Sequence, residues 1–384
     1  MKFEFATAGR IVFGPGAVPK AADLAAEFGR RPLLVGGADE GRYLPLVEHL
    51  TRRGLEVGVF QVPMEPTIEM IRQAVTLAKG VDCDLVVAMG GGSVIDAGKA
   101  IAGLATNPGD PYDYLEVVGK GRELRAAPLP CIAVPTTAGT GAEVTRNAVL
   151  RSTEHEAKVS LRSHRLFPVA ALIDPELTLT LPPRQTADSG LDALTQVLEP
   201  FVSTRRNPLT DAVCREAVPR AARSLVRAFE HGDDIEARRE MSLVSLCGGI
   251  ALTNGGLGAV HGLAAPLGGM LAAPHGAICA RLLPFVFRAV IRGLEARGDR
   301  ESVLGRFDEI GRLLTGLAGS DRRDGLKWME DCGCRLKVSG LSVLGLRKER
   351  IPVVVERALR ASSMRTTPVE LDEEELAGVL TDAL

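Results

Sequence analysis

Residues 84–99 read Asp-Leu-Val-Val-Ala-Met-Gly-Gly-Gly-Ser-Val-Ile-Asp-Ala-Gly-Lys, and this stretch decides the fold. The apolar run at residues 85–89 predicts a buried strand, which leads into Gly90, Gly91 and Gly92 and then into a helix. Glycine lets the backbone approach a ligand closely, and the N–H groups at the start of a helix suit a phosphate. The stretch therefore predicts a phosphate-binding turn, with a tight turn that binds no ligand as the alternative.

The residues after the glycines refine this prediction. Ser93 and Asp96 have the Ser-x-x-Asp spacing of a capping box, which predicts that the helix begins here. The turn is not a Walker A motif, because Ala100 follows Lys99. It is not a G-x-G-x-x-G motif either, because Ile95 occupies the last position. Spacing alone thus indicates phosphate binding without identifying the ligand.

Short apolar strands alternate with amphipathic helices around this stretch. Further strands are predicted at residues 2–5, 10–13, 32–35, 55–62, 128–134 and 169–173, with a hairpin from 147–150 and 157–161. Helices are predicted at residues 17–28 and 44–53 and after residue 67. This alternation predicts an α/β fold with a doubly wound, mainly parallel sheet, in which ligands bind beyond the carboxyl ends of the strands.

The pattern changes at Leu181-Pro182-Pro183, which we take as the domain boundary. Beyond it, helical runs rich in Ala, Leu and Arg dominate, at residues 186–202, 208–230, 235–251 and further on. The one β-like triplet, at residues 353–355, lies inside a predicted helix. The sequence therefore predicts an α/β domain at residues 1–181 and an all-helical domain at residues 182–384.

Composition excludes several classes of protein. The chain has 384 residues with 46 basic and 48 acidic side chains, and this balance leaves no basic stripe for nucleic acid. The first 20 residues lack the apolar segment of a signal peptide. The seven cysteines do not have the spacing of a disulfide framework, which indicates reduced thiols in a cytoplasm. Residues 256–273 are almost wholly apolar, but their glycines, Pro266 and His261 favour a buried helix near a site over a membrane span.

Four side chains of the second half have the chemistry of a metal site. Asp192 and Gln196 are four residues apart on a predicted helix and share one face. His261 and His275 lie in apolar neighbourhoods, where a neutral imidazole needs a partner. A carboxylate with two imidazoles suits Fe²⁺ or Zn²⁺, and an amide oxygen is a weaker fourth ligand. Histidines that are simply satisfied within the core are the alternative.

Four motifs occur in order: residues 90–99, Pro-Thr-Thr-Ala-Gly-Thr-Gly-Ala-Glu-Val-Thr at 135–145, Gly-Leu-Asp-Ala-Leu-Thr at 190–195 and Pro-His-Gly at 274–276. Together they resemble the iron-containing (group III) alcohol dehydrogenases, well over residues 13–284 and loosely beyond. The resemblance implies a Rossmann-like nucleotide domain, a helical metal- and substrate-binding domain, and an active site in the cleft between them. It also implies NAD(P)-dependent interconversion of an alcohol and an aldehyde or ketone with Fe²⁺ or Zn²⁺. Such enzymes are usually cytoplasmic, and homodimers are common.

The resemblance assigns roles to individual residues. The turn residues that would hold the pyrophosphate are Gly91, Gly92 and Ser93, and Gly90 and Asp96 of the same turn are also expected at the cofactor. The residues expected along the rest of the cofactor are Thr136, Thr137, Thr140, Asn147 and Lys158. Asp192, His261 and His275 match three of the family's four metal ligands and form the expected catalytic centre.

Three positions depart from the family pattern. Gln196 stands where the family usually has a metal-binding His, so the metal would bind more weakly or differ in identity. Ala265, four residues after His261, stands where the family often has a His that helps proton relay. Gly37 stands where many NAD-using members have an Asp that repels a 2′-phosphate. With Arg42 as a nearby phosphate partner, NADP(H) is expected to be accepted, and NAD(H) is not excluded.

Three other activities stay open. A maleylacetate-reductase-like enzyme shares the fold and the cofactor but lacks the metal ligands, so Gln196 favours it and the two histidines argue against it. A dehydroquinate-synthase-like lyase would use the cofactor transiently, with no net change in nicotinamide absorbance. A degenerate member that only binds nucleotide is the non-enzymatic alternative.

Overall fold

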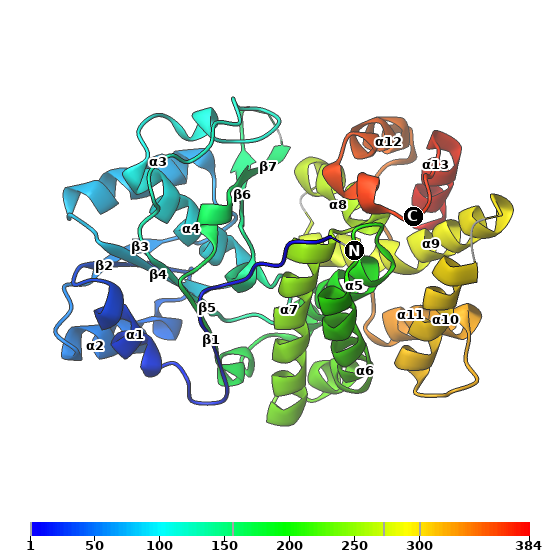
Figure 1. The fold of residues 1–384 in the computed structure, drawn as a ribbon, viewed down its shortest axis with the longest axis horizontal. Helices are drawn as coiled ribbons and strands as arrows, with labels where there is room; N and C mark the ends of the chain where they lie inside the picture. The colour runs from blue at the N-terminus through cyan, green and yellow to red at the C-terminus, as the bar shows by residue number, and fades with distance from the viewer. Residues whose placement is uncertain (1, 156, 272, 299–300) are drawn as a thin grey trace. The chain divides into compact units, whose positions relative to one another are not determined.

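The computed structural model describes residues 2–155, 157–271, 273–298 and 301–384. The chain forms two compact units, which Figure 1 shows as a sheet-containing part and a part made of helices. The α/β unit comprises Thr7–Thr137 and Gly141–Thr178. The helical unit comprises Met1–Ala6, Ala138–Thr140 and Leu179–Leu384. Short segments from elsewhere in the sequence thus belong to the helical unit.

A six-stranded parallel sheet forms the α/β unit, in the order β1-β8-β5-β4-β2-β3. The strands are β1 Ile11–Phe13, β2 Pro32–Gly36, β3 Gly58–Gln61, β4 Leu85–Gly90, β5 Cys131–Pro135 and β8 Ala170–Ile173. The order places the carboxyl ends of β2, β4 and β5 side by side. The prediction of a doubly wound parallel sheet is confirmed.

Helices cover both faces of this sheet, and the alternation of side chains along the strands explains how. Leu33 and Val35 of β2 pack with helices α3 (Ile68–Gly80) and α4 (Gly92–Thr106). Leu34, between them, points the other way and packs with α1 (Lys20–Phe28) and α2 (Leu44–Arg52). Because both faces are buried, the central strands are continuous apolar runs.

Two smaller predictions near the sheet had different outcomes. The predicted hairpin is confirmed as the antiparallel pair β6 (Asn147–Ser152) and β7 (Ala157–Arg162). The strand predicted at residues 2–5 is wrong, because the described part of this segment has no strand and its end joins the helical unit. There the Ala6 N–H donates to Asn254 Oδ1 at 2.7 Å, and Asn254 Nδ2 donates back to the Ala6 carbonyl at 2.9 Å. A side-chain amide therefore takes the place of a neighbouring strand.

The helical unit packs its helices around one aliphatic core. The helices are α5 Pro183–Val202, α6 Pro208–Glu230, α7 Ile235–Gly255, α8 Ala259–Met270, α9 His275–Ala296, α10 Glu301–Thr315, α11 Arg322–Arg335, α12 Ile351–Leu359 and α13 Glu373–Asp382. The triplet at residues 353–355 lies within α12, as predicted. The predicted fold class, an α/β part followed by helices, is confirmed.

Within the apolar run at residues 256–273, Ala259–Met270 form α8, which is largely buried. Among the described residues, no single helix is long and apolar enough to cross a membrane. The helices α7 and α8 meet the length and composition requirements only as a pair, with a bend of 102° at the break between them. Val260, Leu263 and Leu267 of α8 are completely buried in the core of the helical unit.

Candidate functional site

The glycine turn after β4 has the backbone geometry of a phosphate site. β4 ends at Gly90, Gly91 caps the helix with an extended backbone, and α4 begins at Gly92. A Cβ on Gly90 would lie 2.5 Å from a methyl group of Val94, so only glycine fits there. The first N–H groups of an α-helix lack partners within the helix and point toward this turn.

The predicted capping box does not form within the described turn. Gly91 already occupies the capping position, so Ser93 is the second residue of α4 and makes no side-chain cap. Asp96 instead forms an ion pair with Lys99 at 3.0 Å. Burial raises the pKa of Asp96, and the positive charge of Lys99 opposes that rise. The structure thus gives Asp96 a partner within its own helix.

Three neighbouring strand ends converge on the turn. The Thr136 N–H donates to the Gly90 carbonyl at 2.9 Å. A Cβ on Gly91 would lie 3.4 Å from the methyl group of Thr137, and one on Gly37 would lie 3.8 Å from Val94. The structure therefore brings together Gly37, Gly90, Gly91, Gly92, Thr136 and Thr137.

The structure shows the surroundings of the other residues expected along the cofactor. Thr140 is exposed on the segment Ala138–Thr140, which belongs to the helical unit. Asn147 and Lys158 lie toward opposite ends of the β6–β7 hairpin, and Lys158 forms an ion pair with Glu65. Arg42 donates to the Leu177 carbonyl at 2.6 Å. Lys158 and Arg42 thus already have partners.

Lys99 is a buried cation that sequence reasoning did not single out. Its side chain is completely buried, and Nζ donates to the Ala142 carbonyl and to Thr145 Oγ1, both at 2.9 Å. These bonds tie α4 to the segment that follows β5. The neighbouring Glu143 is also buried, and burial raises its pKa to about 7. The only signal in the sequence was the position of Lys99 in an apolar helix.

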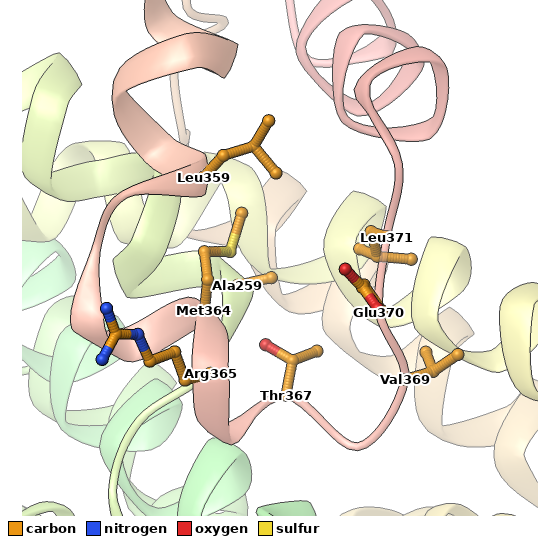
Figure 2. A pocket seen from close by; sticks show the side chains of 8 residues that line it. All are labelled: Ala259, Leu359, Met364, Arg365, Thr367, Val369, Glu370 and Leu371. Carbon is orange, nitrogen blue, oxygen red and sulfur yellow. The ribbon is translucent and has the colours of Figure 1, made fainter.

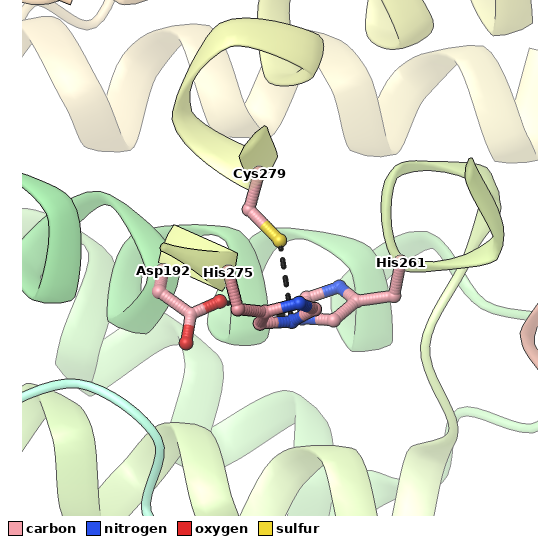
Figure 3. A group of neighbouring side chains, drawn as sticks. All are labelled: Asp192, His261, His275 and Cys279. Atoms are coloured by element: carbon pink, nitrogen blue, oxygen red, sulfur yellow. Dashed lines mark hydrogen bonds and ion pairs between the residues drawn. The ribbon is translucent and has the colours of Figure 1, made fainter. Parts of the chain in front are cut away.

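In the helical unit, three helices bring Asp192, His261, His275 and Cys279 together, as Figure 3 shows. Asp192 is on α5, His261 on α8, and His275 and Cys279 are one turn apart on α9. One ligand atom from each residue lies within 4.8 Å of all the others. Cys279 was not among the predicted site residues.

The Pro-His-Gly motif explains how His275 reaches this cluster. Pro274 precedes the first residue of α9, which is His275 itself. A Cβ on Gly276 would lie 2.3 Å from the carbonyl oxygen of Asp188 on α5. Glycine therefore allows the start of α9 to touch the backbone of α5, one turn from Asp192.

Glu199, which sequence reasoning missed, orients His261. Its Oε2 accepts a hydrogen bond from His261 Nδ1 at 2.6 Å, and its Oε1 accepts one from the Val260 N–H at 2.7 Å. Because a carboxylate only accepts, Nδ1 carries the hydrogen and Nε2 keeps its lone pair. Glu199 is seven residues after Asp192 on the same face of α5, and this spacing was a usable signal.

The buried groups perturb one another's ionisation. Burial raises the pKa of Asp192, but the adjacent imidazole of His261 and the charge of His275 outweigh it and lower that pKa. Burial lowers the pKa of His261, but Cys279 and Asp192 outweigh it and raise that pKa well above its usual value. The pKa of His275 is also raised, chiefly by Cys279. The anionic groups therefore favour a positive charge at this place, either a proton on an imidazole or a bound cation.

Two ligand atoms in the cluster support a metal. Asp192 Oδ1 and His261 Nε2 lie 3.4 Å apart, are buried, and have no hydrogen-bond partner among the described residues. Leaving such an atom unsatisfied costs about 1–3 kcal/mol. A divalent cation satisfies both atoms, and the set of oxygen and imidazole donors fits Fe²⁺ or Zn²⁺.

A surface pocket of about 260 Å³ lies elsewhere on the helical unit (Figure 2). Its described lining residues are Ala259, Leu359, Met364, Arg365, Thr367, Val369, Glu370 and Leu371. None of these is a predicted ligand or cofactor residue. The pocket is therefore not assigned to the reaction.

Comparisons with known proteins agree with these features. The family "Iron-containing alcohol dehydrogenase" matches residues 8–175, and "Fe-containing alcohol dehydrogenase family, C-terminal" matches residues 186–384. Alcohol dehydrogenase 4 of Saccharomyces cerevisiae (strain YJM789) is 33% identical over 377 residues, covering 97% of this chain and 96% of the relative.

Solved structures are similar along the whole chain. The crystal structure of 1,3-propanediol oxidoreductase matches with a TM-score of 0.93 and 31% identity and covers 100% of both chains. Sulfoacetaldehyde reductase from Bifidobacterium kashiwanohense, in complex with NAD⁺, matches with a TM-score of 0.88 and 29% identity, covering 100% of this chain and 99% of that one.

The parallel sheet with its glycine turn, followed by helices that carry an Asp–His cluster, defines a metal-assisted oxidoreductase. More specifically, the chain belongs to the iron-containing alcohol dehydrogenase family. It is an alcohol oxidoreductase, and the family implies a metal, typically iron.

Proposed function

We propose that the chain interconverts a short alcohol and its aldehyde, with NAD(P) on the glycine turn and a divalent metal on Asp192, His261 and His275. The observation that carries this proposal is the buried pair of unpartnered ligand atoms on Asp192 and His261. The names 1,3-propanediol oxidoreductase and sulfoacetaldehyde reductase support a short substrate. We assign cofactor binding to residues 1–181 and metal and substrate binding to residues 182–384, in a cytoplasmic homodimer.

The proposed chemistry divides between the metal and the chain. A divalent metal held by Asp192, His261 and His275 would supply Lewis-acid chemistry at the substrate oxygen. Asp192 supplies negative charge, and Glu199 holds His261 with its Nε2 lone pair toward Asp192. Hydride transfer to or from the nicotinamide belongs to the cofactor, and the protein positions the reactants.

The chain places Ala265 where a proton-relaying imidazole is common in the family. Ala265 lies one turn after His261 on α8 and is exposed. We propose that the proton leaves through water or a ribose hydroxyl. An Ala265→His variant would then add an ionisation near the usual imidazole range to the pH profile of kcat, whereas the wild-type profile lacks it.

We propose that NADP(H) is accepted, because no carboxylate stands at Gly37. A Cβ there would meet only Val94, at 3.8 Å, so the space beside the turn is open. Arg42 has further N–H groups besides the one on the Leu177 carbonyl. Comparing kcat/KM for the two cofactors tests this, and a hundredfold or greater preference for NAD(H) would contradict it.

One assay distinguishes the proposed activity from its alternatives. Metal-free protein is supplied with Fe²⁺ or Zn²⁺ and tested on a panel of short aldehydes with NADH and NADPH. Turnover that requires metal and consumes the reduced cofactor supports the proposal. Full turnover without metal indicates a maleylacetate-reductase-like enzyme. Cofactor binding without net oxidation or reduction indicates a lyase or a binding protein.

A further inference from the structure

Cys279 belongs to the buried cluster although no sequence motif includes it. It is fully buried, and its Sγ lies 3.5 Å from His275 Nε2. In Figure 3 its thiol points at the imidazoles and not away into the core. Its ligand atom is one of the four that lie within 4.8 Å of one another.

Two of the distances between these ligand atoms match those of a tetrahedral site. With metal–ligand bonds of about 2.0–2.3 Å, neighbouring ligand atoms are about 3.3–3.8 Å apart. The distance from Cys279 Sγ to His275 Nε2 is 3.5 Å, and that from His261 Nε2 to Asp192 Oδ1 is 3.4 Å. Both distances lie in this range, and the remaining pairs of ligand atoms are no more than 4.8 Å apart, so the four donors can converge on one cation.

Gln196, the fourth ligand expected from the sequence, is oriented differently. Its Nε2 donates to Asp192 Oδ2 at 2.9 Å, so the nitrogen end of the amide faces the carboxylate. Its Oε1 lies 3.2 Å from the place of a Cβ on Gly248 of α7, away from the carboxylate, and has no hydrogen-bond partner among the described residues. An N–H donor cannot bind a cation, but it can fix the orientation of a carboxylate that does.

The geometry points to Cys279 as the fourth metal donor and to Gln196 as a positioning residue for Asp192. This inference rests on the proposed function, because it requires that the cluster binds a divalent metal. When the metal binds, the Cys279 thiol releases its proton to solvent and the sulfur donates a lone pair to the cation. A sulfur donor favours Zn²⁺, Fe²⁺ or Co²⁺ over Mg²⁺.

Cobalt provides a direct test. Metal-free wild-type protein is titrated with Co²⁺, and the near-ultraviolet charge-transfer band of a Co²⁺–thiolate bond is followed together with the visible d–d bands. We expect both sets of bands at one Co²⁺ per chain. Cys279→Ser should lose the charge-transfer band and bind Co²⁺ at least about tenfold more weakly.

Controls keep the test independent of folding and of other thiols. Cys332→Ser changes a buried cysteine of α11, and Cys334→Ser an exposed one, so both variants should keep the band. Circular dichroism and Tm show whether each variant folds. If Cys279→Ser fails to fold, Cys279→Ala provides the same spectroscopic comparison.

The outcomes separate the inference from the proposed function. Visible Co²⁺ bands and metal-dependent activity without a thiolate band would overturn the role of Cys279 and leave the metal-assisted function intact. No Co²⁺ binding at all would overturn both. Gln196→Ala should keep the thiolate band while weakening Co²⁺ binding by about tenfold, and loss of the band in that variant would overturn the assignment of Gln196.

Discussion

The glycine turn of the α/β unit and the buried cluster of the helical unit are built in opposite ways. The turn is made of backbone from one continuous stretch, residues 90–92, beside the ends of two neighbouring strands. The cluster is made of side chains from α5, α8 and α9, up to 87 residues apart in the sequence. A backbone site tolerates many changes of side chain but depends on glycine. A side-chain site fails when one donor is lost.

The largest effect is expected from removing a predicted metal ligand. His275→Ala should lose most of its bound metal and lower kcat/KM by about 10³-fold or more, because Lewis-acid stabilisation contributes several kcal/mol. Nucleotide binding should be retained, because the turn does not use this side chain. The readouts are elemental analysis and steady-state kinetics. Full activity in metal-free His275→Ala would contradict the mechanism, and exposed His231→Ala serves as the control.

The second-largest effect is expected on the free energy of unfolding, from the titration of Glu143 in the α/β unit. Burial raises the pKa of Glu143 to about 7 from its ordinary value of 4.5, so the folded state holds a proton that the unfolded state releases between these pH values. Stability should therefore fall as the pH rises through this window, by up to about 3 kcal/mol. Glu143→Gln should remove this loss, so that urea midpoints of variant and wild type agree at pH 4 and diverge at pH 8. Equal midpoints at pH 8 would contradict it.

A substitution in the turn tests whether its backbone is as restricted as the structure indicates. Gly90→Val would place its Cβ 2.5 Å from Val94 and should cost about 1–3 kcal/mol of unfolding free energy. It should also weaken NAD(P) binding while leaving metal content unchanged. Fluorescence titration and elemental analysis measure these effects. A Cβ on Gly80 meets no atom within 4 Å, so Gly80→Ala is the matched control.

The smallest effect is expected from a residue that touches the cluster indirectly. Glu199→Gln keeps the shape of the side chain but weakens the hydrogen bond that orients His261. Metal affinity should fall by about 10–100-fold, measured by competition with a chelator. Exposed Glu374→Gln of α13 should leave the affinity unchanged. An unaltered affinity in Glu199→Gln would mean that His261 needs no such support.

The sheet was predictable from the sequence because strands buried on both faces are short, continuous apolar runs. The hairpin was predictable from its two runs around a polar turn. The prediction of a strand at residues 2–5 was wrong for a reason that local sequence patterns do not contain. The backbone at the end of this segment bonds to the side-chain amide of Asn254, about 250 positions later in the chain, and not to another strand. The prediction of a capping box from Ser93 and Asp96 was wrong because Gly91 is already the extended capping residue of α4, with φ −72° and ψ −177°.

The candidate site was predictable where a residue type is unusual for its surroundings. Asp192, His261 and His275 are polar groups in apolar runs, and the structure brings them together. Cys279 lies in a similar run but is indistinguishable there from an ordinary core cysteine. The burial of Lys99 was not predictable, because besides Asp96 on its own helix its partners are a backbone carbonyl and a hydroxyl more than 40 residues away.

The convergence of three helices on one small cluster also has a thermodynamic consequence. A cation held by α5, α8 and α9 would act as a crosslink that forms only in the folded state, so its binding free energy adds to the free energy of unfolding. At a free metal concentration 100 times Kd this gain is about 2.7 kcal/mol. The thermal resistance of this protein would then depend on the metal supply of its surroundings, and a chelator would act on it as a mild denaturant.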